Sequence, residues 1–79
     1  MFEVYAIKSI CRNYLYIGIT NNFERRFKQH NKGQNRTTKP YAPFILILKE
    51  PFPDRIKARE REKYLKSGIG KEYLKSLIK

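Results

Sequence analysis

The strongest constraint on the fold is a period of two in the apolar residues near the start of the chain. Residues 2–8 and 14–19 both show this alternation, which is typical of β-strands. The polar residues 9–13 lie between them, so the two segments are predicted to form a hairpin. The two predicted faces of the second strand consist of Leu15, Ile17 and Ile19, and of Tyr14, Tyr16 and Gly18.

A helix is predicted to follow the hairpin. Asn21 can cap its first turn, with Glu24 three residues later in the capping-box position. Phe23 and Phe27 lie one helical turn apart and are expected to face the core. The helix is expected to end just before residues 33–43, which are polar and basic and are predicted to form a loop.

The second half of the chain predicts one further strand and two helices. Residues 44–48 are a continuous apolar run, which is typical of a strand buried on both faces. Residues 51–54 (Pro-Phe-Pro-Asp) are expected to break this strand, and Asp54 can cap a helix over residues 55–67. The Gly-Ile-Gly sequence at 68–70 is expected to end that helix. A last short helix is predicted to follow, because Leu74, Leu77 and Ile78 lie at helical spacing.

The element order β-β-α-β-α-α predicts one α+β domain over residues 1–79. A chain of 79 residues is near the lower size limit for an independent hydrophobic core. The apolar fraction of 41%, with six Tyr and five Phe, still indicates a folded unit, because disordered chains of high charge contain few aromatic residues.

Basic residues far outnumber acidic ones. The chain has 18 Lys and Arg against 7 Asp and Glu, which gives a formal net charge of +11. This excess attracts polyanions through Coulomb attraction and counterion release, so nucleic acid is the first candidate partner and an anionic membrane surface the second. A membrane partner has little support, because no predicted helix places a broad apolar face opposite a purely basic one.

The cysteine content and the N-terminus bear on the cellular compartment. Cys11 is alone, so an intrachain disulfide is impossible and a structural zinc site is not expected. The first residues lack the basic and apolar regions of a signal peptide, and the longest apolar run is too short to span a bilayer. We therefore expect a reduced, cytoplasmic setting.

Glu62 conflicts with a purely structural reading of its helix. Ala58, Leu65 and Ile69 form a stripe at helical spacing that is expected to face the core, and Glu62 lies on the same stripe. A carboxylate on the inward side of a helix is unfavourable unless it is paired or bound to a cation. The pattern leaves two explanations open, an internal ion pair with an Arg or Lys residue and a metal ligand in a cleft.

Five other residues are candidates for a functional site. Arg26 and His30 lie one helical turn apart, so they could hold a phosphate and transfer a proton, or could both be half-exposed helix residues. Tyr5 and Tyr16 lie within strands, where tyrosines usually pack, but a phenol can also position or deprotonate an attacking water. Gly18 is expected to leave an open patch on the same face, where a phosphate could approach the backbone.

These residues resemble the motifs of the GIY-YIG nuclease superfamily, in particular its small stand-alone bacterial members. Tyr5 matches the last residue of the first motif, and Tyr16-Ile17-Gly18 is the second motif, eleven residues further on. The segment around Arg26 resembles the family's first helix, in which Arg26 matches the catalytic arginine. Residues 58–66 resemble the glutamate helix, in which Glu62 matches the metal ligand. The first motif lacks its Gly and its Ile.

The resemblance implies a three-stranded antiparallel sheet flanked by helices, and hydrolysis of DNA phosphodiester bonds with one Mg²⁺ or Mn²⁺ held by Glu62. It implies that Tyr16 activates the water and that Tyr5 orients the water or the phosphate. Arg26 is expected to stabilise the scissile phosphate, and His30 to assist by hydrogen bonding. Substrate contacts are expected from Gly18, Lys28, Asn31, Arg36, Thr38, Lys39 and Lys66.

The expected partner is DNA, with RNA left open, and the expected state is a monomer or a weak homodimer. The related nuclease modules suggest a role in DNA repair or recombination. No separate DNA-binding domain is visible, so specificity is expected to come from this domain, a dimer or a partner. The alternative function is a non-catalytic nucleic-acid-binding module of the same fold, which the net charge fits equally well. The complete set of candidate catalytic side chains favours the nuclease.

Overall fold

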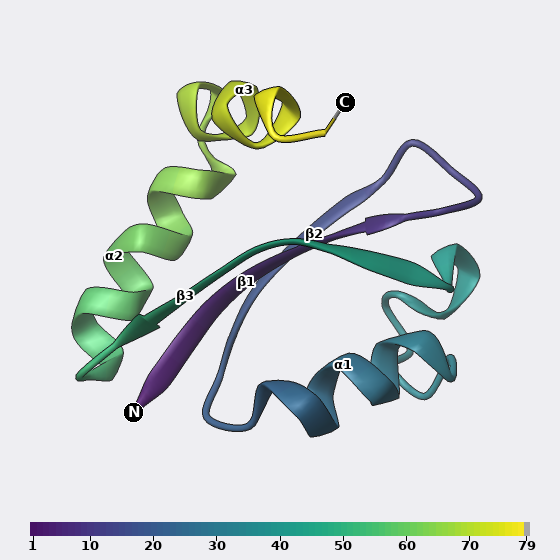
Figure 1. Cartoon of the computed structure of the whole chain (residues 1–79), viewed down its shortest axis with the longest axis horizontal. Helices are drawn as coiled ribbons and strands as arrows, with labels where there is room; N and C mark the ends of the chain where they lie inside the picture. The colour runs from purple at the N-terminus through teal and green to yellow at the C-terminus, as the bar shows by residue number, and fades with distance from the viewer. Residues whose placement is uncertain (79) are drawn as a thin grey trace.

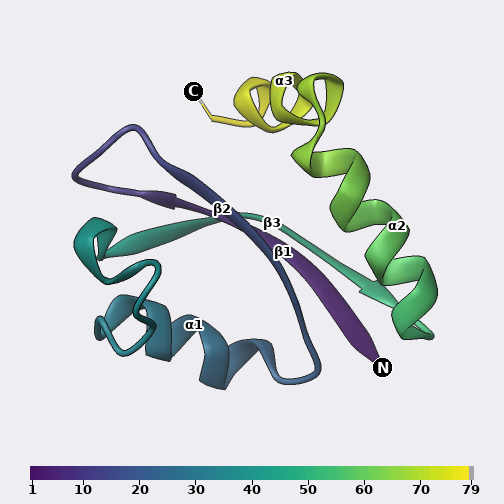
Figure 2. The same ribbon diagram turned by 180° about the vertical axis from the view of Figure 1, so that it is seen from behind.

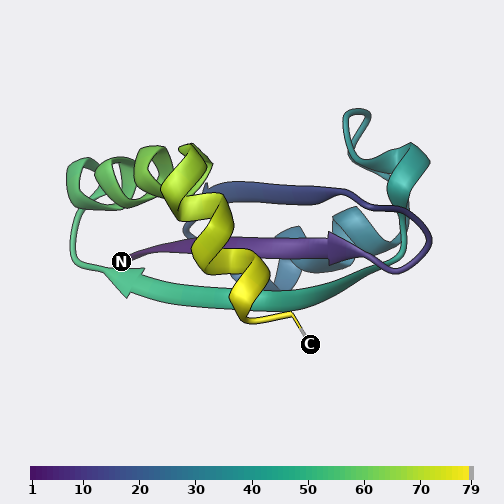
Figure 3. The ribbon, with the colours of Figure 1, turned by 90° about the horizontal axis from the view of Figure 1, so that it is seen from above.

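A three-stranded antiparallel sheet is the central element of the computed structural model, which describes residues 1–78. Strand β1 (Phe2–Ser9) lies between β2 (Leu15–Thr20) and β3 (Phe44–Phe52), as the view from above shows (Figure 3). The hairpin of β1 and β2 is confirmed, and so is the predicted three-stranded antiparallel sheet. Because β1 is central, the outer edges of β2 and β3 have no partner strand among the described residues.

Helices cover both faces of this sheet. Helix α1 (Phe23–Asn31) lies on one face, and α2 (Arg55–Lys66) and α3 (Gly68–Ser76) lie on the other (Figures 1 and 2). A short 3-10 helix, η1 (Lys39–Tyr41), interrupts the loop predicted between α1 and β3. The predicted α+β class and element order are confirmed. No helix within residues 1–78 is long and apolar enough to cross a membrane.

The alternation of side chains along the hairpin divides the core into two halves. Toward α2 and α3 the buried side chains are Val4, Ala6, Ile17, Ala58, Leu65 and Leu74. Toward α1 they are Tyr5, Ile7, Phe23 and Phe44, with Tyr14, Tyr16, Phe27 and Tyr41 packed around them. Both candidate phenols, Tyr5 and Tyr16, therefore lie in the aromatic half of the core, on the face that α1 covers.

The caps of the first two helices are asparagine and aspartate side chains. Asn22 caps α1 by accepting the N–H of Arg25 at 3.2 Å, so the predicted cap, Asn21, is wrong by one residue. The Asn22 N–H donates to Thr20 Oγ1 at 3.0 Å, and this short turn delays the start of the helix. Asp54 caps α2 as predicted, because its carboxylate accepts the N–H of Lys57 at 2.9 Å.

Strand β3 differs from its prediction in burial and in length. It was expected to be buried on both faces, but it is an edge strand in which Ile45 is 45% and Leu46 is 42% exposed. It was expected to stop before Pro51, but it continues to Phe52. An edge strand needs hydrogen-bond partners on one side only, so a proline without an N–H is tolerated there.

The segment 68–70 begins α3 and does not simply end α2. The Ser67 side chain accepts the N–H of Gly70 at 3.2 Å and so caps a new helix directly after the old one. The chain changes direction at this point. Ile69 is therefore 72% exposed, and its predicted place on the core stripe of α2 is wrong.

Helix α3 is short, as predicted, and the three apolar residues whose spacing predicted it differ in burial. Leu74 is fully buried in the half of the core beneath α2 and α3. Leu77 follows the last residue of the helix and is exposed, and Ile78 lies beyond it. The helix crosses above the strands (Figure 3), so one side of it meets the core.

The register of the hairpin places Gly18 directly opposite Tyr5. A Cβ atom at position 18 would lie 2.8 Å from the Tyr5 hydroxyl oxygen and 3.1 Å from Cε2 of Tyr16. The Tyr5 ring therefore passes over the Gly18 backbone, and the open patch predicted at Gly18 is filled by this ring. Glycine is required here because of the close approach of Tyr5.

We expect Gly18→Ala to lower the free energy of unfolding by about 1–3 kcal/mol, because the added methyl group must displace the Tyr5 phenol. Gly68→Ala is the matched control, since a Cβ there meets no heavy atom within 4 Å, and its effect should stay within about 0.5 kcal/mol. Urea unfolding followed by circular dichroism measures both. An equal loss of stability in the two variants would contradict the predicted contact.

Candidate active site

Two clefts lie along the outer edge of β2. The glutamate cleft, of about 360 Å³, is lined by Leu15, Tyr16, Ile17, Glu62, Lys66 and Lys71. The arginine cleft, of about 280 Å³, has as its polar lining Thr20, Asn21, Arg25, Arg26, Gln29 and Arg55. Side chains of α1 and of α2, which cover opposite faces of the sheet, thus reach the same strand.

The rotation of α2 about its axis directs Glu62 toward β2. The preceding residue, Arg61, faces the other way, where its Nε and Nη2 donate to the carboxylate of Glu50 on β3 at 2.7 and 3.1 Å. Consecutive helical residues are about 100° apart, so this bidentate pair holds α2 with Glu62 on the β2 side. The Glu62 side chain is 15% exposed, and its predicted inward position is confirmed.

Glu62 has one ionic partner among the described residues. Its Oε2 lies 3.2 Å from Nζ of Lys66, one turn further along α2, and the Lys66 side chain is 54% exposed. The ion pair considered from the sequence is therefore present, but its cation is a solvent-exposed lysine at the mouth of a cleft. Such pairs contribute only about 0.2–0.5 kcal/mol, so a divalent cation can displace the lysine.

The donor set around Glu62 fits Mg²⁺ or Mn²⁺ better than zinc. No group of three or more His, Cys, Asp or Glu side chains within residues 1–78 could enclose a metal ion. Protein zinc sites need three or four such ligands, whereas Mg²⁺ is commonly held by one or two carboxylates together with substrate phosphates and waters. A single inward carboxylate in an open cleft matches the second arrangement.

His30 joins α1 to the sheet and to the loop before η1. Its Nε2 lies 2.9 Å from the Tyr5 hydroxyl, and its Nδ1 lies 2.8 Å from Thr38 Oγ1. Tyr5, His30 and Thr38 are all buried, so the half-exposed position considered for His30 is wrong. Since both ring nitrogens have partners inside the core, His30 can act on a substrate only by positioning Tyr5.

Burial and nearby charges shift the pKa values of this pair. Burial lowers the pKa of His30, and the positive charge of Arg26 lowers it further, so the ring is neutral near pH 7. Burial raises the pKa of Tyr5 to about 12, and Tyr16 adds to the rise. Among the other influences on the Tyr5 pKa, the Arg26 guanidinium opposes this rise and the Glu62 carboxylate reinforces it. The charges of Arg26 and Glu62 thus both act on the Tyr5 hydroxyl, which stays protonated at neutral pH.

Tyr16 is the more accessible of the two phenols. It is half-buried and lines the glutamate cleft beside Glu62. The centroid of its ring lies 6.2 Å from that of Tyr5 and 4.9 Å from that of His30. The structure therefore brings the five predicted catalytic side chains, Tyr5, Tyr16, Arg26, His30 and Glu62, to one region at the edge of β2.

The residues predicted to contact substrate fall into three groups. Gly18 lies beneath the Tyr5 ring, Thr38 is buried against His30, and Asn31 Oδ1 accepts the N–H of Phe44 at 2.6 Å. The side chains of Thr38 and Asn31 thus serve the fold. Lys66 lines the glutamate cleft. The others are exposed side chains that line neither cleft, namely Lys28, Arg36 and Lys39.

Sequence reasoning missed four polar helix residues that line the clefts. Arg25 and Gln29 lie one helical turn apart on α1, next to Arg26, and that spacing could have indicated a shared polar face. Arg55 and Lys71 come from α2 and α3. Their approach to β2 depends on how those helices dock on the sheet, and no local pattern in the sequence indicates it.

Comparison with known proteins agrees with this fold. A family model described as the GIY-YIG catalytic domain matches residues 1–73. The chain is similar to a UPF0213 protein of Bacillus halodurans whose solution NMR structure is known. The TM-score is 0.57 at 32% sequence identity, and the alignment covers 99% of this chain and 86% of the other.

Curated relatives are also UPF0213 proteins. One from Nitratidesulfovibrio vulgaris is 49% identical over 53 residues, which cover 66% of this chain and 48% of the relative. One from Clostridium perfringens is 40% identical over 68 residues, which cover 84% of this chain and 71% of the relative. The chain spans 48% to 61% of the length of the relatives from Nitratidesulfovibrio vulgaris, Vibrio parahaemolyticus and Xanthomonas campestris.

We expect the stability of the protein to fall as the pH drops from 7.5 to 5.5, because the pKa of His30 is lowered in the folded state. The stability that the neutral ring provides is fully present above its unfolded pKa of about 6.5 and is lost as the pH falls through the folded value. His30 is the one histidine of the chain, so His30→Gln isolates the effect.

His30→Gln should be less stable than wild type by about 1–3 kcal/mol at pH 7.5, since Tyr5 and Thr38 lose a buried partner. The difference should shrink at pH 5.5. Urea unfolding at the two pH values measures it. A difference that is the same at both values would contradict the role assigned to the neutral ring.

Proposed function

The chain belongs to the GIY-YIG catalytic domain family, and from this premise we propose that it is an endonuclease that hydrolyses DNA phosphodiester bonds with one divalent metal ion. The observation that supports this best is the position of Glu62. Its carboxylate is turned inward into a cleft that Tyr16 also lines, and its charge acts on Tyr5 together with that of Arg26. The net charge of +11 suits a polyanionic substrate, and RNA stays an open alternative to DNA.

Glu62 is the residue that would hold Mg²⁺ or Mn²⁺ near the scissile phosphate. When bound, such an ion neutralises the negative charge that builds on the phosphate. Lys66, which pairs with Glu62 in this structure, would meet another phosphate oxygen once an ion occupies that carboxylate. Arg26 donates hydrogen bonds to the same phosphate and stabilises the transition state.

The phenols of Tyr16 and Tyr5 have different roles in the reaction. Tyr16 reaches the glutamate cleft, where its phenolate form would accept the proton of the attacking water. The water oxygen then bonds to phosphorus as the bond from phosphorus to the leaving oxygen breaks. Tyr5 is buried and held by His30, so it orients the water or the phosphate through a fixed hydroxyl group. His30 is a positioning residue. Its neutral ring keeps Tyr5 in place without adding a second positive charge behind it.

We propose that the protein acts as a monomer or weak homodimer in the cytoplasm, in DNA repair or recombination. The proposed chemistry needs only residues between 5 and 66, all of which lie within the matched family domain.

Glu62→Gln should reduce the nicking of supercoiled plasmid in Mg²⁺ or Mn²⁺ by about a hundredfold or more, because the amide keeps the shape of the side chain but loses the charge that holds the metal. Arg26→Ala should reduce the same nicking activity on the order of 10²–10³-fold, because the phosphate loses a hydrogen-bond donor. Glu60→Gln is the matched control, since Glu60 is exposed on the same helix.

Wild-type nicking that persists in EDTA would contradict a metal-dependent reaction. Binding of DNA without nicking, with an affinity that Glu62→Gln leaves unchanged, would instead favour the alternative function, a non-catalytic nucleic-acid-binding module.

Tyr16→Phe should lower kcat by about 10²–10⁴-fold with little change in KM, because it removes a proton acceptor and leaves the ring packing intact. Tyr73→Phe, at an exposed position on α3, is the matched control. Single-turnover cleavage with enzyme in excess isolates the chemical step. If Tyr5→Phe abolishes cleavage while Tyr16→Phe does not, the two roles must be exchanged.

A further inference from the structure

The arginine cleft has more positive charge than the hydrolysis of one phosphate requires. Arg25 and Arg26 reach it from α1, and Arg55 reaches it from α2 on the other side of the sheet edge. No carboxylate lines the cleft, and no ion pair found within residues 1–78 involves any of the three arginines. Three guanidinium groups without an internal counterion form a site of high positive potential that a bound anion would balance.

The backbone around the cleft adds to this potential. Helix α1 begins beside the cleft, so the positive end of its dipole lies close to Asn21 and Arg25. Thr20 lies on the free edge of β2, where backbone groups have no partner strand among the described residues. A positive helix end and free backbone N–H groups can bind the oxygens of a phosphate.

The cleft is also restricted in shape. The Arg55 guanidinium lies 5.9 Å from the centroid of the Phe2 ring, a cation–π contact that limits its motion. The volume of about 280 Å³ lies just below the range of about 300–1,000 Å³ that is usual for drug-sized ligands. A single phosphate with part of its sugar fits this space better than a base pair.

We propose that the arginine cleft binds a second phosphate of the DNA strand, next to the phosphate that is hydrolysed beside Glu62. Arg25, Gln29 and Arg55 hold this second phosphate, and Arg26 lies where the two sites meet, because it lines the arginine cleft and its charge also acts on Tyr5. The inference rests on the proposed function for the identity of the first phosphate.

The strand then follows the outer edge of β2. The glutamate cleft contains Tyr16 and the arginine cleft contains Thr20, and these residues are about 13 Å apart at the usual rise of about 3.3 Å per residue. Arg25 and Arg55 contribute to the affinity for DNA, whereas Glu62 contributes to the chemical step. The two functions can therefore be measured separately.

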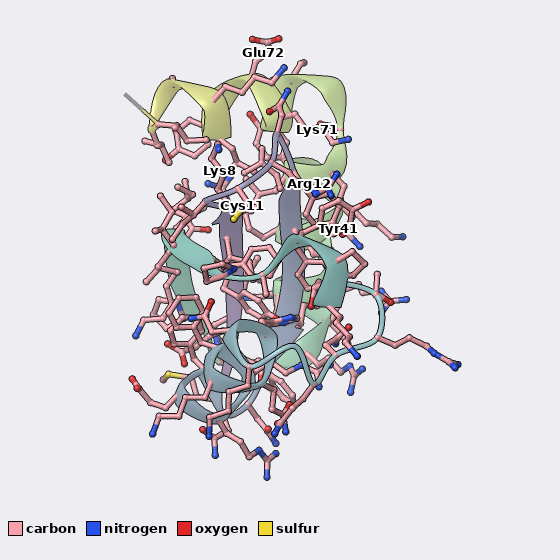
Figure 4. The ribbon with its side chains drawn as sticks, turned by 90° about the vertical axis from the view of Figure 1, so that its right-hand side faces the viewer. Lys8, Cys11, Arg12, Tyr41, Lys71 and Glu72 are labelled. Carbon is pink, nitrogen blue, oxygen red and sulfur yellow. The ribbon has the colours of Figure 1, made fainter. Side chains whose placement is uncertain are left out.

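The test compares DNA binding by wild type, by the double variant Arg25→Ala/Arg55→Ala and by the control Arg12→Ala/Lys75→Ala, which also loses two charges. Arg12 lies in the turn of the β1–β2 hairpin (Figure 4), and Lys75 is exposed on α3, so both are outside the arginine cleft. Fluorescence anisotropy with a labelled duplex in EDTA, at several salt concentrations, measures affinity without cleavage.

The Arg25→Ala/Arg55→Ala variant should bind at least about tenfold more weakly, and its slope of log affinity against log salt should fall by about one, the value of one lost phosphate contact. The control should change the slope by much less. Equal changes in the two variants, or none in the first, would overturn the inference.

Oligonucleotides in which one phosphate at a time is replaced by a neutral methylphosphonate locate the contact. Wild type should lose affinity at a position beside the cleavage site, and the Arg25→Ala/Arg55→Ala variant should show no further loss there. An additive loss at every position would overturn the inference.

The same proteins separate this inference from the proposed function. If wild type cleaves DNA, the Arg25→Ala/Arg55→Ala variant should show a KM at least about tenfold higher with a kcat within about threefold of wild type. If wild type binds with the expected slopes but cleaves nothing, the nuclease function fails while the second phosphate site stands. If both proteins cleave DNA and the KM of the variant is unchanged, the nuclease function stands and the second phosphate site is overturned.

Discussion

The hydrogen bond between Tyr5 and His30 is the contact on which the rest of the site depends. Tyr5 belongs to the central strand, His30 to α1, and Thr38, on the far side of the imidazole, to the loop before η1. These three segments are held together by a polar chain in the aromatic half of the core. No buried side-chain polar atom in the described part of the chain lacks a partner, so the chain of hydrogen bonds is fully satisfied and rigid. The aromatic rings around it exclude water, and this exclusion shifts the pKa values of both residues.

The sheet itself explains why the proposed chemistry is located at one edge. Helices α1 and α2 cover opposite faces, and the three strands separate their side chains everywhere except at the border of the sheet. Arg26 and Glu62 can act on a common phosphate only around β2, and only because no fourth strand among the described residues covers it. The ion pair of Arg61 with Glu50 on the far strand sets the rotation of α2 that makes this possible.

The features that local sequence patterns predict correctly are those that depend on near neighbours. The period of two gives the hairpin and its two faces, and the helical spacing of Ala58, Glu62 and Leu65 gives the inward carboxylate. Whether a strand is central or at an edge depends on which strand pairs with it, so the exposure of Ile45 on β3 could not be read from its apolar run.

The burial of His30 and the arginine cleft also depend on contacts between distant parts of the chain. His30 is buried because Thr38, eight residues away, supplies a second partner. Arg55 reaches the cleft because α2 docks across the sheet edge from α1. The family resemblance identified His30 and Glu62 as members of one site, but only the folded chain shows that one is enclosed and the other opens to solvent.

The exposed edge of β3 has a consequence for the behaviour of the protein in concentrated solution. A nine-residue edge with two exposed apolar side chains is a template on which another chain can add a strand. Mutual repulsion between copies that each have a net charge of +11 opposes this addition at low ionic strength. Salt shortens the range of that repulsion, just as it weakens attraction to DNA. Salt that releases a bound nucleic acid, the partner proposed for this chain, therefore also weakens the repulsion that opposes aggregation.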